Sequence, residues 1–87
     1  MSTKIALIGL GQVGASAGLA LAAYKDQIIR IGHDGSHKRM KELENADVFD
    51  RGETKLAQAV QDADLVIIDF PVDMIRDGLE LMAPHIK

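Results

Sequence analysis

Cysteine and tryptophan are absent from the sequence, and the other aromatic residues are scarce, with one tyrosine and two phenylalanines. Without cysteine the chain has no disulfide, no thiol nucleophile and no thiolate-bound metal. The apolar residues are therefore mainly alanine, valine, isoleucine and leucine, a composition typical of a buried parallel sheet covered by helices. No apolar run approaches the roughly 20 residues that a transmembrane helix needs.

An excess of positive charge is also lacking. The sequence has 10 Lys and Arg against 13 Asp and Glu, for a formal net charge of −3, and the two signs are interspersed along the chain. The basic stretch of Lys38, Arg39 and Lys41 is too short for a nucleic-acid interface. The first residues do not show the charged-then-apolar pattern of a signal peptide. We therefore expect no nucleic-acid partner, no membrane association and a cytoplasmic location.

The 87 residues are enough for one small domain, residues 1–87, in which apolar segments of strand and helix type alternate. Such alternation predicts a parallel sheet with helices on both faces. We expect strands at residues 4–9, 28–33, 48–49 and 65–70. We expect helices at residues 12–24, 36–44 with Ser36 as N-cap, 55–62, and 72–82 with Pro84 beyond the end.

A glycine motif, G-x-G-x-x-G, occupies residues 9–14 between the first expected strand and helix. In that context Gly9 permits a tight turn, Gly11 leaves room for a pyrophosphate, and Gly14 lets the helix approach the strand. The N–H groups of Gln12 and Val13 would point at the phosphates, aided by the helix dipole. A glycine turn that serves only packing is the alternative.

An acidic residue, Asp34, ends the second expected strand 20 residues after Gly14. At this distance a carboxylate is expected to bind the adenosine ribose hydroxyls and to repel a 2′-phosphate, which favours NAD over NADP. A surface turn before Gly35 is the alternative interpretation. A basic group follows directly and would either neutralise a 2′-phosphate or form a solvated first helical turn: His37, Lys38 and Arg39.

Taken together, these residues resemble the prephenate and arogenate dehydrogenase family of the wider 6-phosphogluconate-dehydrogenase-like Rossmann group. The resemblance extends from Lys4 to Lys87. The motifs that carry it are residues 8–11 (IGLG), 14–16 (GAS), 32–34 (GHD), 63–68 (ADLVII), 71–72 (PV) and 81–87 (LMAPHIK). The last two are the more particular to this family. The implied fold is a Rossmann-type sheet with strand order 3-2-1-4.

The resemblance implies a dinucleotide-binding domain of an enzyme that oxidises and decarboxylates prephenate to 4-hydroxyphenylpyruvate, on the route to tyrosine. NAD is the implied cofactor, with NADP as the alternative. The positions carried over to cofactor binding are Gly9, Gly11, Gln12, Val13, Gly14, Asp34, Phe70 and Pro71. Asp69 departs from the family, which usually carries a small neutral residue there. Beside the pyrophosphate, this carboxylate would either repel it or bind the second ribose.

In the family, the catalytic Ser and His belong to a helical domain that follows position 87. We therefore expect a partial chain that holds the cofactor but lacks the base for turnover, because His33, His37 and His85 fit surface or core roles. Two other functions stay open. One is a non-enzymatic NAD sensor of the potassium-transport regulator type, and the other is a different dehydrogenase or an imine reductase of the same group.

The strand at residues 65–70 is expected to form a sheet edge, because the strand that usually pairs with it would follow residue 87. Its sequence, LVIIDF, carries one charge and no lysine, unlike edges that resist association. We therefore expect two copies of this strand to pair across a two-fold axis and to form a homodimer.

Overall fold

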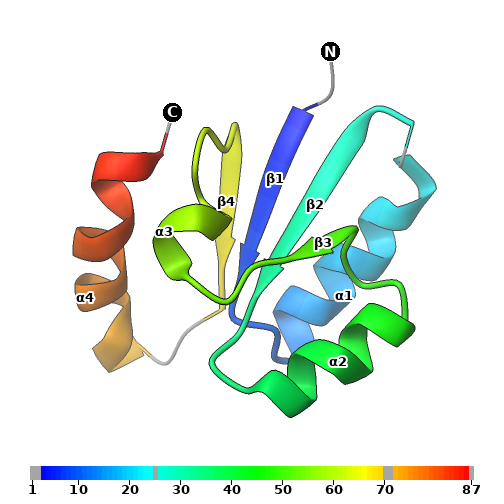
Figure 1. Ribbon diagram of the computed structural model, residues 1–87, viewed down its shortest axis with the longest axis horizontal. Helices are drawn as coiled ribbons and strands as arrows, with labels where there is room; N and C mark the ends of the chain where they lie inside the picture. The colour runs from blue at the N-terminus through cyan, green and yellow to red at the C-terminus, as the bar shows by residue number, and fades with distance from the viewer. Residues whose placement is uncertain (1–2, 25, 70–71, 87) are drawn as a thin grey trace.

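The structure, a computed structural model, describes residues 3–24, 26–69 and 72–86. A parallel four-stranded sheet lies at its centre, with the order β3-β2-β1-β4 (Figure 1). The strands are β1 (Thr3–Ile8), β2 (Ile28–His33), β3 (Arg51–Gly52) and β4 (Leu65–Ile68). The predicted Rossmann-type sheet with order 3-2-1-4 is therefore confirmed.

Within the described residues, four α-helices and two short 3-10 helices connect the strands or follow the last of them. They are α1 (Gln12–Leu21), η1 (Ala22–Tyr24), α2 (His37–Asn45), α3 (Leu56–Ala59), α4 (Val72–Met82) and η2 (Ala83–His85). Figure 1 shows α1 and α2 on one side of the sheet and α3 and α4 on the other, as a doubly wound fold requires. None of these helices, among the described residues, is long and apolar enough to cross a bilayer.

Side chains of β1 alternate between two apolar clusters, one on each face of the sheet. Ile5 and Leu7 belong to the cluster beneath α1 and α2, which also contains Leu43. Ala6 and Ile8 belong to the cluster beneath α3 and α4. A strand whose side chains are buried on both faces reads as a continuous apolar run, which is why residues 5–8 are apolar without interruption.

Two expected elements in the middle of the chain differ from the structure. Val48 and Phe49 are buried, at 1% and 4% exposure, but they do not pair as a strand, and β3 is formed by Arg51 and Gly52. The ring of Phe49 lies against Gly32 of β2, so its burial comes from packing above the sheet. The expected helix at residues 55–62 is also shorter, because α3 ends at Ala59.

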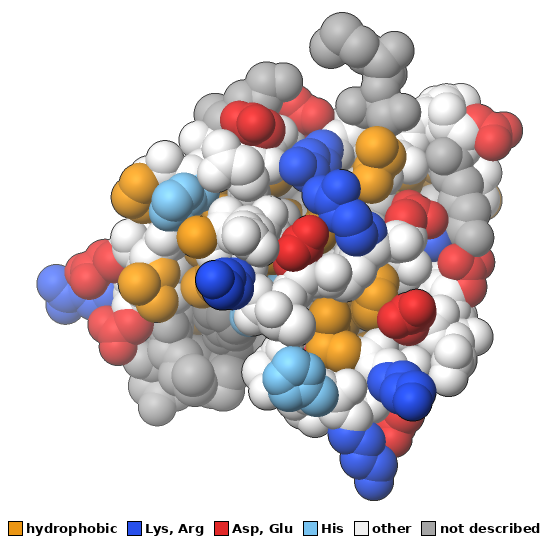
Figure 2. Space-filling view, viewed as in Figure 1, with side chains coloured by type: hydrophobic (Ala, Val, Ile, Leu, Met, Phe, Trp, Pro, Cys, Tyr) orange, Lys and Arg blue, Asp and Glu red, His pale blue; other side chains and the backbone are white. Residues whose placement is uncertain are grey.

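Helix α2 begins as expected, because the Ser36 hydroxyl accepts a hydrogen bond from the Arg39 N–H at 3.2 Å. The first long helix ends earlier than expected: α1 stops at Leu21 and continues as the 3-10 helix η1. Short 3-10 segments are common at helix ends, where the final carbonyl groups lack partners in the next turn. Acidic and basic side chains of the described residues are interspersed over the face shown in Figure 2.

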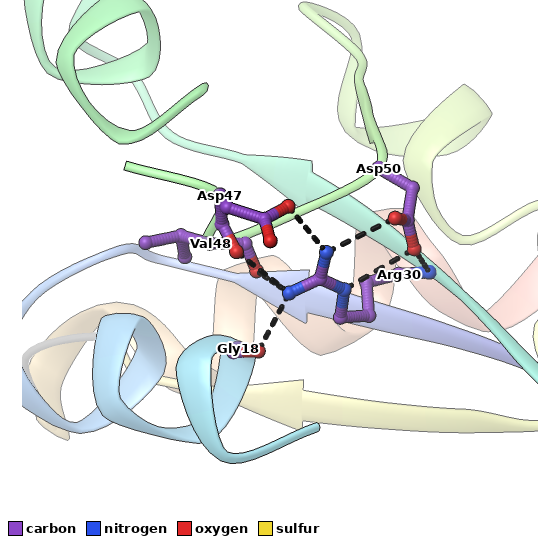
Figure 3. A network of polar contacts seen from close by, with 5 residues as sticks. All are labelled: Gly18, Arg30, Asp47, Val48 and Asp50. Atoms are coloured by element: carbon purple, nitrogen blue, oxygen red, sulfur yellow. Dashed lines mark hydrogen bonds and ion pairs between the residues drawn. The ribbon is translucent and has the colours of Figure 1, made fainter. Parts of the chain in front are cut away.

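A buried arginine, Arg30, links β2 to helix α1 and to the segment after α2 (Figure 3). The side chain of Arg30 is 0% exposed. Its Nη1 donates to the carbonyl oxygens of Gly18 and Asp47 at 2.7 Å and of Val48 at 3.2 Å. Its Nη2 and Nε donate to the carboxylates of Asp47 and Asp50 at 3.0–3.1 Å. The guanidinium thereby joins β2, α1 and the segment after α2.

The hydrogen bond to Asp50 is the largest influence on Arg30, and it raises the pKa of the guanidinium above its ordinary value. Burial acts in the opposite direction, and the bond to Asp47 adds to the rise. Asp47 adopts a left-handed backbone conformation, with φ of 61°, directly after α2. The arginine therefore fixes the strained residue that turns the chain from α2 toward β3.

Candidate functional site

The glycine loop lies between β1 and α1, at the carboxyl end of the sheet. Gly9 has a φ of 86°, a conformation that favours glycine, and its N–H donates to the His33 carbonyl of β2 at 2.8 Å. The tight turn assigned to Gly9 is therefore present. It directs the chain away from β1 and into α1.

Gly14 lies against the backbone of the same loop. A Cβ built on Gly14 would overlap the carbonyl oxygen of Gly9, so only glycine allows this approach between helix and loop. A Cβ on Gly11 would instead meet the Asp69 carboxylate, with 2.8 Å to its Oδ2. The two glycines therefore differ: backbone confines Gly14, whereas the end of a side chain confines Gly11.

The start of α1 is suited to an anion. Gly11 is the N-cap residue and has no side chain with which to cap the helix, and the first turn contains no acidic residue. Gln12 and Val13 are exposed, Val13 at 65%. Helical N–H groups at this end carry partial positive charge, which matches the phosphate role that the motif predicts for them.

Asp34 lies beside the glycine loop, half-buried, just beyond the end of β2. Its Oδ2 accepts a hydrogen bond from the Leu10 N–H at 2.8 Å, and its Oδ1 accepts one from the Ser36 N–H at 3.0 Å. The carboxylate is thus held by two backbone groups, one in each loop. The structure brings Asp34 and the glycine motif together at the carboxyl ends of β1 and β2, as their separation in sequence predicts.

Arg39 also binds the loop, a contact that the sequence did not reveal. Its Nε donates to the Leu10 carbonyl at 2.9 Å, while Asp34 accepts from the N–H of the same residue. Arg39 is only partly exposed, whereas His37 and Lys38 are exposed. A guanidinium and a carboxylate therefore flank Leu10, so that negative charge at this corner is partly balanced.

Asp69 reaches the same loop from the other side. It follows β4 directly, and its backbone N–H continues the sheet by donating to the Ile8 carbonyl at 2.8 Å. Its Oδ2 accepts a hydrogen bond from the Gly14 N–H at 3.1 Å. This carboxylate therefore caps α1 from a distant part of the chain. The sequence marked Asp69 as unusual but did not indicate this partner.

The sequence also singled out two residues beyond Asp69 and three histidines. Phe70 and Pro71 fall outside the described residues. The Nδ1 of His33 lies 2.9 Å from the Glu53 carbonyl oxygen. His37 is exposed at the start of α2, and His85 lies in η2. In the described part of the chain, no group of three or more His, Asp or Glu residues is placed to hold a metal ion.

Comparison with known proteins gives consistent matches. The family model described as "NADP oxidoreductase coenzyme F420-dependent" matches residues 4–87. Cyclohexadienyl dehydrogenase of Zymomonas mobilis is 32% identical over 83 residues, which are 95% of this chain and 28% of that protein. The chain thus spans less than a third of this relative.

Two solved structures share the fold. Prephenate dehydrogenase from A. aeolicus, in complex with hydroxyphenyl propionate and NAD+, superposes with a TM-score of 0.87 at 18% identity, over 100% of this chain and 31% of its own. Synechocystis arogenate dehydrogenase superposes with a TM-score of 0.81 at 25% identity, over 98% of this chain and 30% of its own. The chain belongs to the F420-dependent NADP oxidoreductase family and is a prephenate/arogenate-dehydrogenase-like NAD(P)-binding domain.

Proposed function

We propose that this chain binds NAD(H) in preference to NADP(H). The observation that supports the preference is the position of Asp34, whose carboxylate is fixed beside the glycine loop by the N–H groups of Leu10 and Ser36. A carboxylate so placed accepts hydrogen bonds from two ribose hydroxyls and repels a phosphate on the 2′ oxygen.

The residues of the loop fit a dinucleotide. The start of α1 offers the N–H groups of Gln12 and Val13 to the pyrophosphate, and Gly11 adds no side chain of its own to the approach. When bound, the nicotinamide supplies a hydride acceptor. The proposed binding residues are Gly9, Gly11, Gln12, Val13, Gly14 and Asp34, with Phe70 and Pro71 beside the nicotinamide half.

We further propose that the domain serves an oxidoreductase that converts prephenate to 4-hydroxyphenylpyruvate. The matches to cyclohexadienyl, prephenate and arogenate dehydrogenases support this substrate class. The chain's own part in the reaction would be to bind and orient the cofactor. We assign the base to none of its histidines: the His33 ring lies against the Glu53 carbonyl, His37 is exposed on α2, and His85 lies in η2.

Isothermal titration calorimetry of the 87-residue chain with NAD and with NADP tests the binding proposal. NAD should bind at least about tenfold more tightly, which corresponds to about 1.4 kcal/mol. Equal or tighter binding of NADP would mean that the basic residues at the start of α2 govern the choice and that Asp34 does not. Absence of binding by both nucleotides to the folded chain would remove the proposed function.

A further inference from the structure

The first turn of α1 already has an anionic partner within the chain. The N–H of Gly14, the third residue of the helix, donates to the Asp69 Oδ2 at 3.1 Å. A bond between Asp69 N–H and the Ile8 carbonyl holds the Asp69 backbone in the sheet, so the side chain projects from a fixed point. A carboxylate from the end of β4 thus occupies one of the positions that helix N-termini offer to anions.

The same carboxylate lies beside the expected path of the pyrophosphate. A Cβ on Gly11 would come within 2.8 Å of the Asp69 Oδ2 and within 3.7 Å of its Cγ. Gly11 is the residue whose missing side chain lets a pyrophosphate approach the loop. Any phosphate bound to the Gln12 and Val13 amides would therefore share the end of α1 with a full negative charge.

The charges of the helix end and of the Asp69 carboxylate determine how this side chain affects phosphate binding. The end of a helix contributes about half a positive charge, whereas a carboxylate contributes a full negative one. Repulsion between a carboxylate and a phosphate a few ångströms apart is large enough to change an affinity by about tenfold or more. We propose that Asp69 competes with the pyrophosphate for the start of α1 and so lowers the affinity for dinucleotides. This inference rests on the proposed function.

The alternative role for Asp69 is to accept a hydrogen bond from the second ribose. It predicts a change of NAD affinity in the opposite direction when the carboxylate is removed. If the carboxylate bound a ribose hydroxyl, its removal would weaken NAD binding. If it competes with phosphate, removal of its charge strengthens NAD binding. The two roles are therefore separated by the direction of a single measured change.

Calorimetric titration with NAD compares the wild-type chain with Asp69→Asn, Asp69→Ala and Asp26→Asn. Asp69→Asn removes the charge but keeps an oxygen that can accept from Gly14 N–H, whereas Asp69→Ala removes both. Asp26→Asn is the matched control, because it changes net charge equally. Asp26 is exposed just before β2, at the amino ends of the strands, whereas the glycine loop lies at their carboxyl ends. Circular dichroism verifies that each variant is folded.

We expect Asp69→Asn to bind NAD about tenfold more tightly than the wild type, and Asp26→Asn to bind as the wild type does. The gain should shrink as salt is raised, because screening weakens the repulsion in the wild type. Adenosine, which carries no phosphate, should bind the wild type and Asp69→Asn equally in an NMR titration. Asp69→Ala should also gain affinity for NAD, although its melting temperature should fall with loss of the helix cap.

Unchanged or weaker NAD binding by Asp69→Asn, with normal binding by the wild type, would overturn the competition and leave the proposed function intact. An equal gain for adenosine would also overturn it, since the effect would then not involve the phosphates. Failure of every folded variant to bind NAD would remove the proposed function and this inference with it.

Discussion

A single carboxylate, that of Asp34, is held by backbone groups from two loops, which leaves its orientation little freedom. Asp34→Ala should therefore remove the discrimination between NAD and NADP. NAD affinity should fall about tenfold through the lost ribose hydrogen bonds, while NADP affinity should rise or stay level as repulsion disappears. Titration calorimetry with both nucleotides measures the change. A variant that keeps the full NAD preference would show that Asp34 serves only the Leu10 turn.

Gly11 and Gly14 should respond differently to the same substitution. Gly11→Val meets the end of the Asp69 side chain, which can move, so the fold should survive. The new side chain should nevertheless obstruct the pyrophosphate and weaken NAD binding about a hundredfold or more. Calorimetry measures the binding, and circular dichroism should remain close to that of the wild type. Undiminished binding would return the loop to a role in packing alone.

Gly14→Val is the counterpart, because its side chain would meet the Gly9 carbonyl, which is backbone and cannot rotate away. We expect it to destabilise the domain by about 3 kcal/mol or more, through steric overlap in a closely packed place. Thermal or urea unfolding followed by circular dichroism measures the loss. A variant as stable as the wild type would contradict the close approach seen between α1 and the loop.

The tight turn at Gly9, the close approach at Gly14 and the position of Asp34 beside the loop could be predicted from sequence, because each depends on local backbone geometry at the end of a recognisable strand. The contacts of Asp69 with Gly14 and of Arg39 with Leu10 could not. They join residues 55 and 29 positions apart, respectively, and depend on side-chain rotamers that no spacing rule specifies. The surroundings of the glycine loop thus include side chains outside the motif itself.

Among the elements, β2 and the segment after α2 are joined by the side chain of Arg30 as well as by backbone hydrogen bonds. Arg30→Met should remove the buried donor that the carbonyls of Gly18, Asp47 and Val48 share, together with the guanidinium that pairs with two carboxylates. We expect a loss of about 3–5 kcal/mol, a large part of the 5–15 kcal/mol typical of a whole domain. Urea unfolding measures the difference.

The control for Arg30 is Arg76→Met on the exposed surface of α4. Arg76 has a side chain that is 89% exposed and lies 3.7 Å from Glu80, so its loss should change stability little. Similar destabilisation by the two variants would show that the Arg30 network contributes no more to stability than an exposed ion pair does.

The pH dependence of the Arg30 effect follows from the direction of its pKa. A group whose pKa is raised on folding contributes fully below its unfolded pKa, and the contribution disappears only as pH rises through the folded value. For an arginine, both lie far above neutral. The cost of Arg30→Met attributable to this charge should therefore be the same at about pH 6 and about pH 9, as measured by urea unfolding. A cost that falls steeply within this interval would contradict a permanently charged guanidinium.

The bounds of β2 and α4 were predicted as observed and those of β1 to within one residue, because β1 and β2 are short apolar runs that end at turn signals and the apolar residues of α4 recur at helical spacing. The structure of the segment from Asp47 to Gly52 was not predictable, because two adjacent apolar residues, Val48 and Phe49, look in sequence like a short buried strand. In the structure, the Arg30 network holds the start of this segment. Pairing with β2 begins only at Arg51. An arginine between isoleucines in residues 28–31 was the one available signal of a buried charge.

At the scale of the whole molecule, β4 is an outer strand of the described sheet and pairs with β1 on one side. Leu65 in β4 is 52% exposed, and α4 presents Leu79 and Leu81 at 44% and 65% exposure. An edge without lysine or proline offers unpaired backbone groups to another strand. This arrangement supports the proposal that residues 1–87 associate through β4.

Association through β4 would join two four-stranded sheets across a two-fold axis. Sedimentation velocity at micromolar concentration should then show a dimer, and a uniform 9.4 kDa species would contradict it. Proline at position 68 is the decisive variant. Because Asp69 N–H donates to Ile8 of β1, alternation along the strand directs Ile68 N–H toward the open edge. Ile68→Pro should therefore abolish the dimer while preserving the pairing with β1, whereas Ile68→Val, which keeps the N–H, should sediment as the wild type does.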